Sequence, residues 1–167
     1  INTLTDTALE GRLDVRGDEN KFGGVYDGII MGVNNILDVV SVPMDMTANY
    51  LDRISKGDIP EKITMQFQGD FDKIRSNLNV LIENLSKTVH VAECLAKGDL
   101  SVEVAILSEK DMLGKSLEIM VKTIDGIVGD INALTRSVSH GNLDVCGDVE
   151  KFKGEYSKII KGVNETL

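Results

Sequence analysis

The chain has 167 residues, of which only 4% are aromatic and none is tryptophan, so its core must rely on Leu, Ile, Val and Met. Such a core suits helix-on-helix packing better than a sandwich or a barrel. The formal net charge of −9 argues against nucleic acid and anionic membranes as partners, because both need a basic face.

No run of the sequence approaches the ~18 apolar residues that a membrane-spanning helix needs, and no N-terminal signal peptide is visible. We therefore expect no direct membrane span. Both ends of the chain fall within stretches of helical periodicity, which indicates an internal piece of a longer protein. Cys94 and Cys146 lack CxxC or zinc-ligand spacing, which favours reduced thiols in an intracellular protein.

The sequence repeats itself. Residues 1–37 and 131–167 align without a gap and are identical at 20 of 37 positions. A glycine followed by a polar and then an aliphatic residue begins at Gly11, Gly57, Gly98 and Gly141. Each of these glycines closes a stretch of helical periodicity, where a residue free to take positive φ is a natural stop. We predict four helix–connector–helix repeats: residues 1–40 (N-terminally truncated), 41–84, 85–126 and 127–167 (C-terminally truncated).

The apolar residues of the predicted helices step alternately by 3 and 4, the a and d spacing of a narrow seam packed against other helices. The series runs unbroken from Phe71 to Leu95 and from Leu113 to Val138, so each stretch should be one continuous helix shared by two repeats. Between Val33 and Met44 the series needs one extra step of 4, a stutter, with Pro43 beside it. This junction is either a mechanical joint or a tolerated irregularity.

The seam is predicted to comprise Phe22, Tyr26, Ile29, Val33, Met44, Leu51, Ile54, Phe71, Ile74, Leu78, Leu81, Leu85, Ala92, Leu95, Leu113, Leu117, Met120, Ile124, Ile127, Ile131, Leu134, Val138, Phe152, Tyr156, Ile159 and Val163. The connectors should be anchored between the helices by Leu13, Val15, Ile59, Ile63, Leu100, Val104, Leu143 and Val145.

A single chain of such repeats cannot cover its own seam. The economical solution is a parallel homodimer, in which two helices from each chain form a four-helix bundle and successive bundles stack. The predicted fold class is therefore all-α, built of stacked parallel four-helix bundles with long helices continuous between them.

Several motifs resemble HAMP domains, the signal-relay modules of bacterial and archaeal transmembrane receptors. They are "KGDI" at 56–59 and, in the third repeat, "AKGDLSVEV" followed by "SEKDMLGKSLEIM", with Glu109 and Asp111 as the acidic pair before the second helix. The first and fourth repeats depart from the pattern, because Gly17-Asp18 and Gly147-Asp148 interrupt their connectors. Arrays containing "EGRLDVRGD" resemble those of methyl-accepting chemotaxis proteins more than those of sensor kinases.

The resemblance implies a parallel dimeric relay between flanking sensory and output domains, in the cytoplasmic part of an inner-membrane receptor or in a soluble receptor. Such a relay needs two packings separated by a few kcal/mol. Thr47, Thr88 and Ala92, small or polar at seam positions, are candidates for that near-degeneracy or are simply imperfect packing. The relay segment of a sensor histidine kinase and a passive coiled-coil spacer are the rival functions.

No converging catalytic groups, metal ligands or cofactor motif are evident, so we expect no enzyme, no metal site and no cofactor. His90 and His140 read as surface or helix-capping imidazoles. Asn34, Asn79 and Asn164 recur near the ends of second helices, where an Asn either fixes register at a seam or is simply exposed. The likeness of the first and fourth repeats suggests that both prefer the same bundle geometry.

Overall fold

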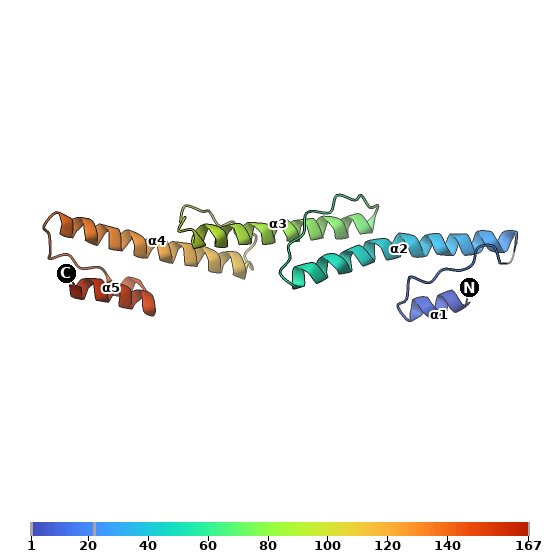
Figure 1. Ribbon diagram of the computed structural model, residues 1–167, viewed down its shortest axis with the longest axis horizontal. Helices are drawn as coiled ribbons and strands as arrows, with labels where there is room; N and C mark the ends of the chain where they lie inside the picture. The colour runs from blue at the N-terminus through green and yellow to red at the C-terminus, as the bar shows by residue number, and fades with distance from the viewer. Residues whose placement is uncertain (1, 22, 167) are drawn as a thin grey trace. The chain divides into compact units, whose positions relative to one another are not determined.

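The computed structural model describes residues 2–21 and 23–166, and within them every regular element is helical. The elements are α1 (Asn2–Leu9), α2 (Val25–Ser55), α3 (Asp70–Ala96), α4 (Met112–Ser139), a 3-10 turn η1 (Val149–Lys151) and α5 (Glu155–Thr166) (Figure 1). The predicted all-α class is confirmed. The chain divides into two compact units, Ile1–Ser86 and Lys87–Leu167, which are described separately below.

The long helices run through the predicted repeat boundaries. Helix α3 continues past residue 84 and α4 past residue 126, as the unbroken apolar series indicated, and α2 continues past residue 40 in spite of the stutter. Pro43 lies buried inside α2, where it cannot donate the usual bond to the carbonyl of Val39. Thr47 Oγ1 donates to the Pro43 carbonyl at 2.7 Å, and the helix continues without interruption. The stutter is therefore accommodated within a regular helix.

Each first helix ends at one of the four predicted glycines. Gly11, Gly57 and Gly141 have φ +81° and Gly98 has φ +79°, a region in which a side chain would be strained. After Gly57 the Asp58 N–H donates to the Arg53 carbonyl at 3.0 Å, which satisfies a carbonyl that the helix end leaves open. The chain then turns back as an irregular connector.

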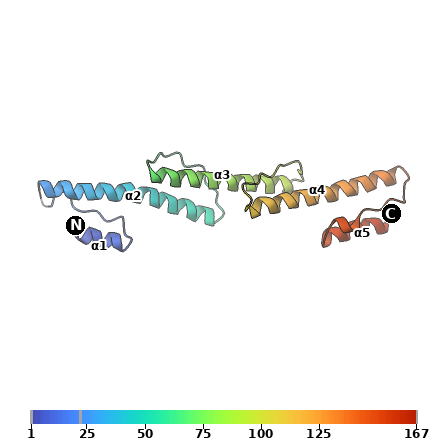
Figure 2. The ribbon, with the colours of Figure 1, turned by 180° about the vertical axis from the view of Figure 1, so that it is seen from behind.

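The connectors are residues 10–24, 56–69, 97–111 and 140–154, numbered connector 1 to connector 4. Each runs back beside a helix, so that the helices on its two sides point the same way, as Figures 1 and 2 show for α1 with α2 and for α4 with α5.

Helix α2 is the most apolar of the long helices. By length and composition alone it could cross a membrane, with an 18-residue window of mean hydropathy 1.3 of which 17% is buried. The expectation that no stretch approaches this limit was therefore wrong for α2. The same helix carries Asn34 and Asp38, whose side chains bond to connector 1. Part of α2 is thus covered by connector 1.

Candidate functional site

The first connector is held to α2 by a side-chain amide. Asn34 Oδ1 accepts from the Gly17 N–H at 2.9 Å, and Asn34 Nδ2 donates to the Gly17 carbonyl at 2.9 Å. Both atoms of one amide thus pair with both backbone groups of one residue, as an adjacent β-strand would do. Asn34 Nδ2 also reaches Glu19 Oε1 at 2.8 Å, and the side chain is buried. We call this arrangement an amide clamp.

Gly17 is required here because its backbone lies against the helices. A Cβ at this position would come within 2.7 Å of Ile30 Cγ2 and 3.0 Å of Leu4 Cδ1, closer than carbon atoms pack. Gly17 is not among the glycines with positive φ, so the requirement is one of space. The glycine that interrupts the HAMP connector pattern is therefore what lets connector 1 approach α2.

The fourth repeat uses the same clamp. The Gly147 N–H donates to Asn164 Oδ1 at 2.7 Å, and Asn164 Nδ2 donates to the Gly147 carbonyl at 2.9 Å. A Cβ on Gly147 would meet Ile160 Cγ2 at 2.7 Å and Leu134 Cδ1 at 3.1 Å. The two ends of the chain therefore share the paired hydrogen bonds and the close approach of the glycine, which explains part of their sequence likeness, whereas the Glu19 contact has no counterpart at Val149.

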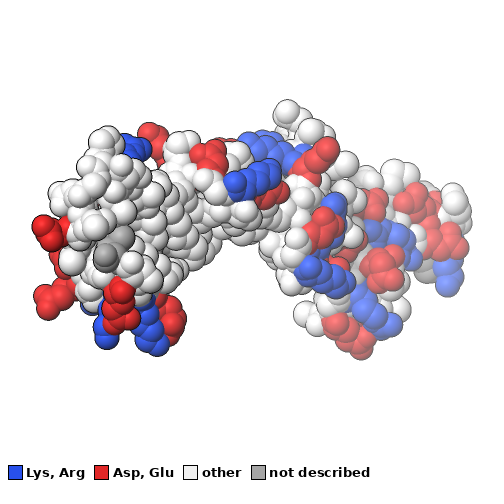
Figure 3. All heavy atoms as spheres, turned by 60° about the vertical axis from the view of Figure 1, so that its left-hand side comes forward, with Lys and Arg blue, Asp and Glu red and all other residues white. Residues whose placement is uncertain are grey.

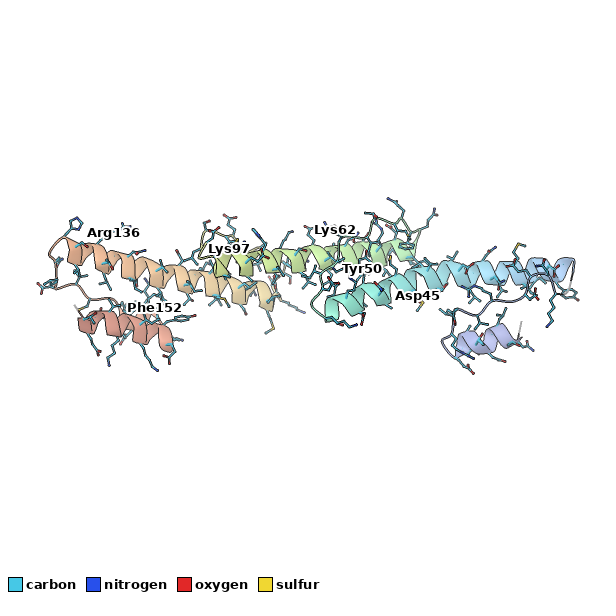
Figure 4. The ribbon with its side chains drawn as sticks, viewed as in Figure 1. Asp45, Tyr50, Lys62, Lys97, Arg136 and Phe152 are labelled. Carbon is cyan, nitrogen blue, oxygen red and sulfur yellow. The ribbon has the colours of Figure 1, made fainter. Side chains whose placement is uncertain are left out.

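Beside this clamp lies a small apolar core. Ile127, Phe152 and Ile160 are buried together, Ile160 completely, with Ile131 and Val149 packed against them. Figure 4 shows Phe152 at the connector, on the side of α5 that faces α4. Lys151 Nζ lies 5.3 Å from the centre of that ring and pairs with Asp130 Oδ1 of α4 at 2.7 Å. Connector 4 is thus fixed to the helices before and after it.

The second repeat keeps the amide but replaces the glycine. The Ile63 N–H donates to Asn79 Oδ1 at 2.7 Å, and Asn79 Nδ2 donates to the Ile63 carbonyl at 3.0 Å. The Ile63 side chain is only 4% exposed, so it occupies space that the connector backbone takes at Gly17. Lys62, labelled in Figure 4, pairs with Glu83 of α3 at 2.6 Å, an exposed contact that adds little stability.

The third repeat is fastened differently. Asp111, the N-cap of α4, accepts from the Gly114 N–H at 2.8 Å and from the Leu107 N–H at 2.8 Å. These backbone hydrogen bonds, first from Leu107 and then from Gly114, hold the pKa of the Asp111 carboxyl below its ordinary value. The carboxylate thus joins the last part of connector 3 to the first turn of α4.

The clamps have a clear energetic meaning. A hydrogen bond of this kind contributes about 0.5–1.5 kcal/mol net, whereas a buried backbone group left without a partner costs about 1–3 kcal/mol. Each clamp satisfies two such groups, so its loss would be felt twice. Asn34, Asn79 and Asn164 bond to connectors, a role that differs from both alternatives that the sequence left open, a seam position and a simply exposed one. Their recurrence 16 or 17 residues after the bonded connector residue is the signal that could have indicated this role.

Connector 1 has a second attachment that the sequence analysis missed. Arg16 Nε and Nη2 donate to Asp38 Oδ1 at 2.8 and 2.6 Å, and Nη2 reaches Ser41 Oγ at 3.2 Å. Its Nη1 donates to the carbonyls of Leu13 and Val15. Arg16 therefore ties connector 1 to α2 just before Pro43. Cys146 holds the matching position in the fourth repeat and is exposed.

The eight predicted connector anchors differ in how far their side chains are buried. Ile63 is buried and Leu143 is 59% exposed. The other six are half-buried, namely Leu13, Val15, Ile59, Leu100, Val104 and Val145. Leu143 is therefore the predicted anchor with the greatest exposure.

The predicted seam is distributed between the interior and the surface of the single chain. Four members are buried: Leu78, Ile127, Leu134 and Phe152. Eleven are exposed: Tyr26, Ile29, Met44, Leu51, Ile74, Leu81, Ala92, Leu113, Met120, Tyr156 and Ile159. Ten are half-buried: Val33, Ile54, Phe71, Leu85, Leu95, Leu117, Ile124, Ile131, Val138 and Val163. Phe22 lies outside the described residues.

The exposed members leave a large apolar surface. Tyr26 is 65% exposed, Met44 52% and Leu113 54%. Figure 3 shows broad uncharged areas on the part of the molecule that comes forward, with Lys, Arg, Asp and Glu gathered at their edges. Tyr26, Met44 and Leu113 are thus large side chains that the single chain leaves open to solvent.

Groups that could support chemistry are scattered. Within residues 2–21 and 23–166, no three His, Cys, Asp or Glu side chains come together as metal ligands would. His140 caps α4, with Nδ1 2.7 Å from the Arg136 carbonyl oxygen, and His90 Nε2 lies 3.7 Å from Cys94 Sγ on the exposed side of α3. Of the two imidazoles, only that of His90 lies near a described nucleophile, the Cys94 thiol.

Comparison with known proteins bears on this architecture. Residues 21–87 match the HAMP domain family. Over 110 residues, 66% of its length, the chain is 31% identical to a protein of Acetivibrio thermocellus that is named as a sensory transducer. The chain corresponds to 20% of that relative. No solved structure matches the chain significantly. Helix α2, connector 2 and the greater part of α3 thus coincide with the region that matches the HAMP domain family.

Proposed function

We propose that the whole chain is an array of four HAMP repeats that relays a conformational change from a sensory input to an output domain of a chemoreceptor-like transducer. The observation that carries the proposal is the presence of exposed seam residues on α2, α3 and α4 together with connectors that return the chain beside the helices. A passive spacer needs no connector that returns the chain beside each helix. The fastened connectors therefore favour a relay over a spacer.

The proposed working form is a parallel homodimer without catalytic activity, located in the cytoplasm. A second chain would cover seam residues such as Ile29, Leu81 and Met120, which are 43%, 38% and 46% exposed. Burial of apolar surface contributes about 25 cal/mol per Å², so a seam this long favours association strongly. Within this proposal, the shared Gly17 and Gly147 clamps support the idea that the first and fourth repeats adopt one bundle geometry.

A chemoreceptor is favoured over a sensor kinase by the relative named as a sensory transducer and by the "EGRLDVRGD" likeness. A kinase predicts a phosphoacceptor helix and an ATP-binding domain after residue 167, whereas a chemoreceptor predicts a long antiparallel coiled-coil hairpin. The sequence that follows in the full-length gene product decides between the two.

The dimer is tested by single cysteines at exposed seam positions. Leu81→Cys and Met120→Cys, each made with Cys94→Ser and Cys146→Ser, should cross-link to their own counterparts through a short bis-maleimide reagent. Leu78 is less suitable because it is only 6% exposed. Lys122→Cys is the matched control, since Lys122 lies on the side of α4 opposite Met120 and pairs only with Glu118 at the surface.

The parallel bundle requires that the seam variants cross-link efficiently and the Lys122 variant poorly. Equal yields at all three positions, or cross-linking of Leu81→Cys only to Met120→Cys when the variants are mixed, would contradict it.

A further inference from the structure

We propose that Asn34, Asn79 and Asn164 are positioning residues that fix each connector to its helix, and that the third repeat is the one whose connector is free to change position along the helix. The inference rests on the proposed relay function and says where in the array movement is possible. It follows from the presence of the amide clamp in the first, second and fourth repeats and from the residue that stands in its place in the third repeat.

The seam provides the alignment of the third repeat with the second. Superimposing the steps of 4 and 3 that begin at Ile74 and at Leu113 places Leu117 on Leu78 and Glu118 on Asn79. The burial pattern supports this register, because Ile82 and Val121 then coincide and both are buried. Glu118 therefore occupies the clamp position in α4.

A glutamate cannot form the clamp. A carboxylate accepts hydrogen bonds but has no N–H with which to donate to a connector carbonyl. Glu118 instead accepts from Lys122 Nζ at 2.7 Å, one turn along the same helix, and its side chain is 39% exposed. The third repeat thus lacks the group that would fix its connector opposite the middle of the helix.

The middle of connector 3 is held by apolar contacts alone. Val102 and Val104 are half-buried, and within the described chain no side-chain hydrogen bond reaches the backbone of residues 102–106. The start of the connector is joined to α3 by the Asp99 N–H, which donates to the Cys94 carbonyl at 2.9 Å, and its end is joined to α4 by Asp111, which accepts from the Leu107 and Gly114 N–H groups. Connector 3 is therefore tied near its ends and free between them.

Apolar contacts and amide clamps respond differently to helix rotation. A valine loses little when it shifts from one groove of a helix to the next, because dispersion contacts are not directional. A clamp has one position, because its two hydrogen bonds need both backbone groups of one residue. Rotation of a clamped helix must carry its connector with it, whereas α4 can rotate beneath Val102 and Val104.

Amide hydrogen exchange on the whole chain tests this directly. The amides of Gly17, Ile63 and Gly147 should exchange at least about tenfold more slowly than that of Val104, after correction for intrinsic rates, since the first three donate to Asn side chains. Protection of Val104 equal to that of Ile63 would overturn the proposal.

Loss of one clamp provides the second measurement. Asn79→Leu removes both the acceptor of the Ile63 N–H and the donor to its carbonyl, and we expect exchange at Ile63 to accelerate by about tenfold or more while Gly17 is unchanged. Asn77→Leu is the matched control, because it makes the same substitution two residues away, at an exposed position of α3. Equal acceleration by both variants would assign the effect to helix stability and contradict a clamp.

Gain of a clamp in the third repeat provides the third measurement. Glu118→Asn should slow exchange in the stretch 102–106 by about tenfold, which a general change in helix stability would not do selectively. No slowing there would show that the missing amide is not what leaves connector 3 free. The exchange experiments and the cross-linking experiment test separate proposals. Failure of the Leu81 and Met120 variants to cross-link would contradict the dimer, and the expected exchange pattern would be unaffected.

Discussion

At the scale of single residues, the packing of two connectors depends on two glycines that leave no room for a Cβ. Gly17 and Gly147 give their Cβ space to an isoleucine and a leucine, and each offers its backbone to an Asn. A Gly-Asp pair in a connector reads from the sequence as an interruption, since glycine is the usual mark of a turn. The sequence could not show that the glycine lies against another helix, because that contact joins residues far apart in the chain.

Gly17→Ala should therefore destabilise the protein by about 1–3 kcal/mol, the usual cost of forcing extra volume into a packed site. Gly28→Ala is the control, because Gly28 lies within α2 with no heavy atom within 4 Å of an added Cβ. There alanine should be neutral or stabilising by up to about 1 kcal/mol, owing to its higher helix propensity. Urea unfolding measures both. Equal destabilisation by the two would refute the close approach.

At the scale of elements, the long helices are what the sequence predicted best. The a and d series identified α3 and α4 as continuous, and the glycine stops marked where the chain turns back, because both signals are local. The connectors were predicted less well. Leu143 was expected to anchor and is exposed, while Arg16 was not singled out although it reaches Asp38 and Ser41. Those contacts depend on geometry that periodicity does not encode.

The start of α4 is held by Asp111, and its stability should depend on pH. The pKa of Asp111 is lowered in the folded protein by hydrogen bonds from the Leu107 and Gly114 N–H groups. The folded state therefore stabilises the ionised carboxylate relative to the protonated acid. Its contribution is complete above the ordinary value of 3.8 and is lost as the pH falls through the lower folded value. Stability should therefore decline in acid partly through this group.

Asp111→Asn, which still accepts as a cap, should make the loss of unfolding free energy between about pH 6 and about pH 3 smaller than in the unmodified chain. Asp125→Asn serves as the control, because its carboxylate is exposed on α4 and is not a cap. Thermal unfolding of the three chains at both pH values gives the comparison. An equal pH dependence for all three would show that Asp111 does not couple the connector to proton binding.

At the scale of the whole molecule, the exposed seam predicts an assembly whose stability depends on concentration. Light scattering should give twice the 18.2 kDa mass of the chain, and the melting temperature should rise with protein concentration, because association stabilises only the folded form. Met120→Glu should lower both by burying a charge in the bundle. Lys122→Glu places the same charge on the far side and should leave the mass unchanged. A monomer that melts at one temperature at all concentrations would refute the dimer.

The clamps also bear on how such a chain can grow or shorten in evolution. Each Asn amide bonds to a residue 16 or 17 positions earlier in the chain. Both partners of a clamp therefore lie in one connector and the helix that follows it, and the clamp needs no residue of a neighbouring repeat. A duplicated repeat would therefore arrive with its fastening intact. The continuity of α2, α3 and α4 sets the opposite condition, since any insertion must keep the apolar series in phase across the join. Copies of this kind can be added freely in number but only in permitted lengths.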